Sequence, residues 1–165
     1  MNNFFKISFC ALLAGQCLAT EPLLGAFGKK FGDSFDPSTA ESQRLIDGSE
    51  IYLFTTTNGF RSFHSYYVAI TPTTHKIYAI RAQSIDMRAG DLNQERDLVM
   101  HLLSEKYGPE TTSGRERQIT QGNRSVVTRI FGVQLEIIYT DSALAELARK
   151  ESLAERAKNV DKSGL

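Results

Sequence analysis

The stretch from Ser65 to Ser84 (SYYVAITPTTHKIYAIRAQS) constrains the fold more than any other part of the chain. Two runs of aromatic and β-branched residues flank a Pro-Thr-Thr-His break, which predicts a β-hairpin that turns at Pro72–Lys76. In this register Val68 lies opposite Ile80 and Tyr66 lies opposite Ala82. Since side chains alternate between the two faces of a strand, one face should form the core. That face carries Tyr66, Val68, Ile70, Tyr78 and Ile80.

Similar patterns predict the rest of the sheet. Glu50–Thr57 reads as a strand, and Asn58-Gly59 is a strong signal for a tight turn into the strand Phe60–Thr71. Arg115–Asp141 contains three more strands, with a two-residue turn at Gly122-Asn123 that places Gln121 opposite Arg124 and Ile119 opposite Val126. The alternation after Gly132 predicts a half-buried last strand.

Each set of three strands is followed by a predicted helix. Asp91–Tyr107 should begin with Asp91 as its cap and end at Gly108-Pro109. Its apolar stripe is expected to contain Leu92, Val99, Leu102 and Leu103. A second helix should run from Ala143 to about Lys158, with a cap at Asp141-Ser142. The predicted fold is therefore α+β: an antiparallel sheet of about six strands (βββα twice) with two helices packed on one face.

The first nineteen residues have the layout of a secretory signal peptide. A positive start with Lys6 precedes the short apolar run Ile7–Gly15, and Ala19 offers a small residue for cleavage. The expected organisation is a signal peptide at 1–19, one domain at 20–158 with an irregular lead-in at 22–48, and a frayed tail at 159–165. This places the protein in the periplasm or outside the cell, without stable membrane insertion after cleavage. A lipid anchor at Cys17 remains an alternative to simple cleavage.

Charge and cysteine content narrow the classes of function. The chain has 19 Lys and Arg against 19 Asp and Glu, so it has no long-range attraction for nucleic acid. The two cysteines, Cys10 and Cys17, both lie in the predicted leader, and no cysteine metal site or disulfide is expected after cleavage. Gly25, Gly28 and Gly32 do not have the spacing of a phosphate-binding loop. The lead-in Pro22–Ala40 should instead tuck Leu23, Leu24, Phe27, Phe31 and Phe35 under the core.

The sequence shows no catalytic or metal-binding motif, and no cofactor is expected. His64, His75 and His101 lie apart along the chain, and no serine lies in a Gly-x-Ser-x-Gly elbow. A small envelope hydrolase that pairs His64 or His101 with a carboxylate is the alternative in the enzyme class. A third hypothesis is apolar-ligand binding between sheet and helices, which needs a cavity of several hundred Å3.

The remaining candidate is a surface for another protein. The second face of the sheet should present Arg and aromatic side chains together, a combination enriched at protein interfaces. The candidate binding residues are Arg61, Phe63, Tyr67, Arg81, Arg129 and Phe131. The competing interpretation is that the lead-in covers this face. The leading hypothesis is a noncatalytic secreted or periplasmic binding module of the inhibitor, immunity or envelope-assembly type. Its partner would be another envelope or secreted protein, bound through this face or the loops Thr111–Arg117 and Phe131–Gly132.

Overall fold

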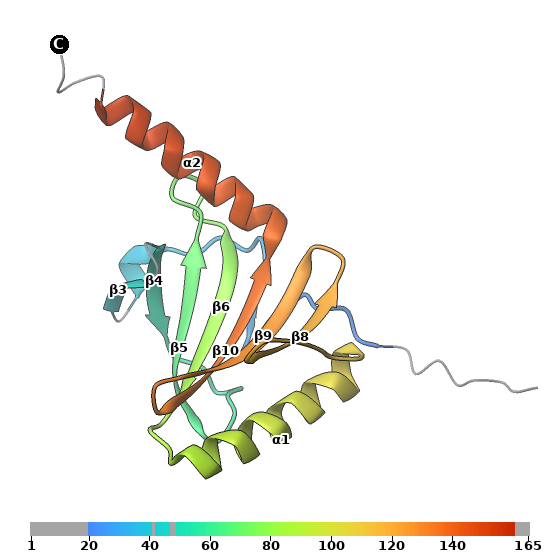
Figure 1. Cartoon of the computed structure of the whole chain (residues 1–165). Helices are drawn as coiled ribbons and strands as arrows, with labels where there is room; N and C mark the ends of the chain where they lie inside the picture. Colours follow the sequence, from blue (N-terminus) through green and yellow to red (C-terminus); the bar gives the residue numbers. More distant parts are fainter. Residues whose placement is uncertain (1–19, 41, 47–48, 161–165) are drawn as a thin grey trace, which may run out of the picture.

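The computed structural model describes residues 20–40, 42–46 and 49–160, and it has an α+β fold (Figure 1). Its main sheet is antiparallel, with strand order β3-β4-β5-β6-β10-β9-β8-β7. The first half of the sheet consists of β3 (Ser42–Ile46), β4 (Ser49–Phe54), β5 (Phe63–Ile70) and β6 (Ile77–Ser84), followed by α1 (Ala89–Tyr107). The second half consists of β7 (Thr111–Ser113), β8 (Glu116–Gln121), β9 (Arg124–Phe131) and β10 (Gln134–Asp141), followed by α2 (Ser142–Val160).

The two halves repeat one plan and join at their last strands. Each is a four-stranded meander followed by a helix, and β6 pairs with β10 in antiparallel fashion at the centre of the sheet. The α+β prediction is confirmed. The sheet of eight strands is larger than the expected six, because the short edge strands β3 and β7 were not predicted.

The central hairpin has the expected register over most of its length. Val68 pairs with Ile80 and Tyr66 with Ala82. Ile70, however, pairs with Ile77 rather than Tyr78, because a register shift lies between Ala69 and Ile70. An extra residue in one strand reverses the alternation beyond it. As a result, the expectation that Tyr78 shares the face of Val68 was wrong.

Both faces of β5 are buried. The main core contains Tyr66, Val68 and Ile80, together with the apolar residues of α1 and the lead-in. A second cluster on the other face contains Ile51, Tyr67, Ala69 and Ala79, and Tyr78 packs against it. Tyr67 was expected to face solvent, and this was wrong because it is buried in the second cluster.

The lead-in covers the main core rather than the second face. Leu23, Phe31 and Phe35 are buried there, whereas Leu24 is exposed. Its small hairpin, β1 (Gly25–Ala26) and β2 (Lys29–Lys30), precedes a short 3-10 helix, η1 (Pro37–Thr39), that Asp36 caps. Pro37 at the start of this helix and the Asp36 side chain, which accepts from the Ser38 amide at 2.9 Å, favour the turn.

The connection between β4 and β5 differs from the expected tight turn at Asn58-Gly59. Eight residues, 55–62, separate the two strands, and Phe60 packs its ring against Phe27 and Phe63. The Tyr66 hydroxyl lies within donating distance of the carbonyl oxygens of Phe60 and Phe63, at 3.3 and 3.2 Å. The loop therefore folds back over Tyr66 instead of turning at once.

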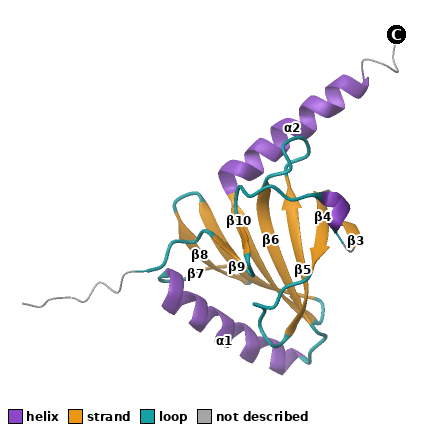
Figure 2. Cartoon of the chain, turned by 180° about the vertical axis from the view of Figure 1, so that it is seen from behind, coloured by secondary structure: helices purple, strands orange, loops and turns teal. Residues whose placement is uncertain are grey.

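The two helices meet opposite ends of the sheet (Figures 1 and 2). Helix α1 begins at Ala89, two residues before the expected cap Asp91, and buries Leu92, Val99, Met100, Leu103 and Tyr107. Helix α2 packs Leu144 against the main core, and its Glu151 accepts hydrogen bonds from the backbone of Thr73 (2.7 Å) and Thr74 (3.2 Å). Its later turns extend beyond the sheet. Within the described residues, neither helix is long and apolar enough to span a bilayer.

Candidate functional site

The predicted binding residues separate into buried and accessible groups. Phe63 lies in the main core, so the expectation that it faces outward was wrong; a register shift between Phe63 and Ser65 accounts for this. Tyr67 and Arg81 are directly paired across β5 and β6, and Arg81 is half-buried. Arg61 is exposed in the loop that precedes β5.

Arg129 and Phe131 lie at the end of β9, and they remain accessible. Arg129 Nε donates to Glu136 Oε2 at 2.7 Å, and the Glu136 side chain is almost fully buried. The guanidinium also lies 5.9 Å from the centre of the Phe131 ring. The buried carboxylate on β10 therefore fixes the Arg129 head beside an aromatic side chain that is 62% exposed.

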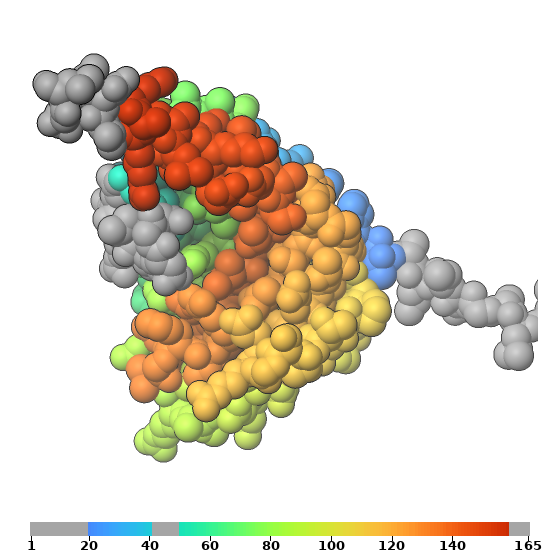
Figure 3. Space-filling view, turned by 45° about the horizontal axis from the view of Figure 1, so that its top comes forward, coloured from blue at the N-terminus to red at the C-terminus, as the bar shows by residue number. Residues whose placement is uncertain are grey.

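The structure brings together the two loops that were expected to bind a partner. Residues of Thr111–Arg117 and of Phe131–Gly132 line one groove of about 1020 Å3, which also borders the first half of α1. Figure 3 shows the yellow and orange surfaces of these segments meeting below α2. Gly114 and Gly132 each have a φ close to 60°. They form the turns of the β7–β8 and β9–β10 hairpins, and the two loops contain these turns.

The groove is lined by charged side chains of both signs. Arg117 donates to Glu110 and to Asp97, so its charge is balanced within the groove. The hydrogen bond with Glu110 is the largest influence that raises the pKa of Arg117, against the opposing effect of burial. Arg115 forms no ion pair within the described residues and is exposed.

An exposed apolar patch lies beside the groove. Phe131, Val133 and Ile85 are each more than half exposed. The Met87 amide donates to the Val133 carbonyl at 2.8 Å, and Gln134 Nε2 donates to Asp86 Oδ1 at 2.9 Å. These bonds hold the segment after β6 next to the β9–β10 turn. We call the groove together with Phe131, Val133 and Ile85 the sheet-end surface.

The histidines lie apart from one another and from the sheet-end surface. His101 Nε2 lies 3.3 Å from Glu105 Oε1, but both side chains are about two-thirds exposed on one face of α1. His64 is exposed on β5, and His75 lies in the β5–β6 loop. Among the described residues, no group of three His, Cys, Asp or Glu side chains could hold a metal ion.

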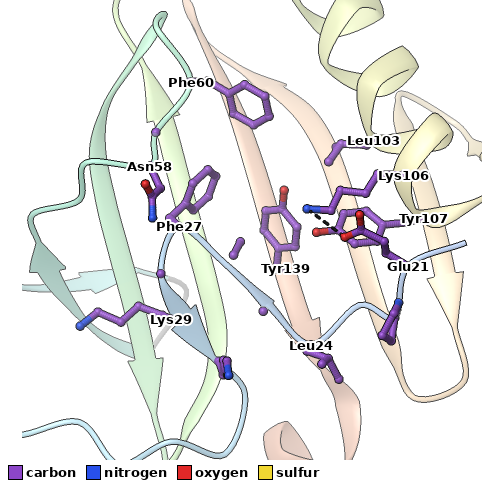
Figure 4. A pocket seen from close by; sticks show the side chains of 16 residues that line it. Glu21, Leu24, Phe27, Lys29, Asn58, Phe60, Leu103, Lys106, Tyr107 and Tyr139 are labelled. Carbon is purple, nitrogen blue, oxygen red and sulfur yellow. Dashed lines mark ion pairs between the residues drawn. The ribbon is translucent and has the colours of Figure 1, made fainter.

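A second pocket, of about 540 Å3, lies between the lead-in, the 55–62 loop and the end of α1 (Figure 4). Its walls are largely apolar, and they include Leu24, Phe27, Phe60, Leu103, Tyr107 and Tyr139. Lys106 and Glu21 form an exposed ion pair of 3.3 Å at its edge. The sequence placed Phe27 under the core and predicted a half-buried last strand, but it did not reveal this pocket, since the walls come from segments far apart in the sequence.

No family model, curated protein or solved structure matches this chain. The function of the chain is therefore inferred from the two sites described above.

Proposed function

We propose that this chain is a noncatalytic binding module that engages another protein through the sheet-end surface. The observation that carries the proposal is the convergence of Thr111–Arg117 and Phe131–Gly132 on one groove, beside an exposed apolar patch. Exposed large apolar side chains next to arginine are typical of the energetically important centre of protein interfaces.

The charges of the sheet-end surface indicate the chemistry of the partner. Arg115 is exposed at the turn of the β7–β8 hairpin, and Arg96 donates to the Arg115 carbonyl at 3.4 Å. Arg117 is occupied by Glu110 and Asp97. A partner segment with an apolar side chain flanked by carboxylates would pack on Phe131 and Val133 and pair with Arg115.

The signal-like residues 1–19 support an envelope or secreted location for this interaction, and the proposed partner is an envelope or secreted protein. The histidine-based hydrolase receives no support from the geometry of His64 and His101. The His101–Glu105 pair lies on the exposed surface of α1. His64 lines a separate pocket of about 410 Å3, but it forms no ion pair with a carboxylate of the described residues.

The test compares capture by the mature protein with capture by two variants. Phe131→Ala and Leu153→Ala each remove an exposed apolar side chain, the first from the sheet-end surface and the second from α2. Exposed substitutions of this kind change stability by about 0.5 kcal/mol or less. Proteins captured from envelope extract are identified by mass spectrometry, and their affinities are then measured with purified components.

The proposal expects a partner that wild type and Leu153→Ala bind equally and that Phe131→Ala binds at least about tenfold more weakly. Arg115→Gln should weaken the same complex and reduce its salt dependence, because one charge pair with the partner is lost. Equal binding by all the variants would show that the sheet-end surface is not the interface.

A further inference from the structure

We infer that the pocket of Figure 4 is a second, separate binding site, and that it takes a small apolar monocarboxylate. It is drawn from the size and lining of the pocket, the Tyr139 hydroxyl in its wall and the Lys106 ammonium at its edge. It does not depend on the proposed protein interface, because the pocket and the sheet-end surface share no lining residue.

The pocket has the size and lining of a small-molecule site. Its volume of about 540 Å3 lies within the usual range of about 300–1000 Å3 for such sites. The rings of Phe27, Phe60, Tyr107 and Tyr139 line it together with Leu24 and Leu103, and they offer an apolar environment to the body of a ligand.

Phe27 holds an unfavourable backbone conformation at this position. Its φ is 53°, and with Gly28 (φ 80°) it forms the turn between β1 and β2. Such a φ is uncommon for a bulky side chain, and strained residues of this kind gather at ligand sites. The turn points the Phe27 ring edge-on toward the Tyr139 ring, with ring centres 5.6 Å apart. The Thr56 hydroxyl donates a hydrogen bond of 3.0 Å to the Phe27 carbonyl oxygen.

Tyr139 supplies a neutral hydrogen-bond donor in the pocket wall. The residue is 2% exposed, and its hydroxyl points into the pocket, where it forms no hydrogen bond with any described residue. Burial raises the pKa of Tyr139, with a further contribution from Tyr107, so the phenol stays protonated and available as a donor. A phenol that opens into a pocket can donate to a ligand oxygen.

Lys106 supplies the charge. Burial lowers the pKa of Lys106, but Tyr107 and Glu21 raise it by more, so the amine remains protonated. Its bond with Glu21 is exposed, and exposed ion pairs contribute little, so a ligand carboxylate can replace Glu21. Two other lysines line the pocket: the Lys29 ammonium lies over the rings of Phe35 and Phe54, at 5.5 and 5.1 Å, and Lys30 is exposed on β2. The Lys106 ammonium and the neutral Tyr139 donor fit a ligand with a carboxylate head and an apolar body.

Calorimetric titration of the cleaved protein tests this with three probes of equal chain length: decanoate, 1-decanol and decylammonium, each below the concentration at which it aggregates. We expect decanoate to bind at least about tenfold more tightly than the alcohol, and decylammonium to bind most weakly. If decanoate does not bind, or binds no better than 1-decanol, the assignment is wrong.

Two variants locate the binding, and each has a matched control. Tyr139→Phe keeps the ring and should weaken decanoate binding about tenfold, whereas Tyr78→Phe, outside the pocket, should have no effect. Lys106→Gln should abolish the preference for decanoate over decanol, whereas Lys150→Gln on α2 should preserve it. Lys106 is about half exposed, so its variant tests the site even if Tyr139→Phe folds poorly. Equal effects of Lys106→Gln and Lys150→Gln would place the binding elsewhere.

Discussion

The Asp141 carboxylate and the Arg124 guanidinium form an ion pair of 2.9 Å that joins the ends of β10 and β9 immediately before α2 begins. The same carboxylate accepts from Asn123 Nδ2 at 2.8 Å and from the amides of Ala143 and Leu144 at 3.1 and 3.2 Å. One nearly buried side chain therefore caps the helix, closes the β8–β9 turn and pairs with an arginine.

Asp141→Ala removes all of these bonds at once. We expect the free energy of unfolding to fall by about 2–4 kcal/mol, because a helix cap is lost and a partly buried arginine loses its partner. Urea unfolding followed by circular dichroism measures the change. Glu146→Ala is the matched control: its carboxylate pairs with Arg149 on the exposed surface of the same helix, and its midpoint should equal that of wild type.

Neighbouring leucines of α1 should differ sharply in their contributions to stability. Leu103 is 3% exposed and Leu102 is 44% exposed, although both were expected in one apolar stripe. Successive residues of a helix are rotated by about 100°, so only one of the two can face the sheet. Leu103→Ala should cost about 2–4 kcal/mol, and Leu102→Ala about 0.5 kcal/mol or less. Equal losses in urea unfolding would show that α1 is rotated from the orientation described.

Two glycine substitutions should have opposite signs. Gly122 has a φ of 60° in the β8–β9 turn, whereas Gly90, in the first turn of α1, does not have a positive φ. A Cβ added at either position would meet no atom within 4 Å. Gly122→Ala should therefore cost about 1–2 kcal/mol through backbone conformation alone. Gly90→Ala should stabilise the protein by about 0.5–1 kcal/mol, because alanine loses less entropy in a helix. Thermal melts of both variants check the signs, and a loss of stability in Gly90→Ala would contradict the helix start at Ala89.

Local chemistry made much of the fold predictable. Three predictions follow from residues close in the sequence, and all three are present in the structure: the Gly122-Asn123 turn, the cap at Asp141 and the pairing of Val68 with Ile80. The interior position of Tyr66, Val68 and Ile80 follows from alternation. Each of these features depends on interactions over a few residues, which a single sequence can reveal.

Features that depend on distant contacts were not predictable. The residue pattern does not indicate the register shift between Ala69 and Ile70. Because of this shift, Tyr78 packs against the second cluster instead of the main core. The burial of Tyr67 contradicts the assumption that one side of β5 is solvated. The pocket required Phe27, Tyr107 and Tyr139 to converge from the lead-in, α1 and β10. Alternation assigns a face to a residue, but it does not say what covers that face.

The raised pKa values of three tyrosines predict that the protein loses stability at alkaline pH. Burial, followed by the hydrogen bond to Glu50, raises the pKa of Tyr52 to about 12, and burial raises the pKa of Tyr66 and of Tyr139. These groups favour the neutral form in the native state, whereas tyrosines of an unfolded chain ionise near about pH 10. Their stabilising contribution is thus complete below about pH 10 and is lost as the pH rises toward about 12.

Near-ultraviolet absorbance of tyrosinate measures this directly. At about pH 11 the native protein should show clearly fewer than its six tyrosines ionised, whereas the protein in concentrated guanidinium chloride should show all six. Tyr139→Phe should leave the native signal unchanged and remove one tyrosine from the unfolded signal, because Tyr139 is neutral in the native state. A native curve in which all six titrate together near about pH 10 would contradict the enclosed positions of Tyr52, Tyr66 and Tyr139.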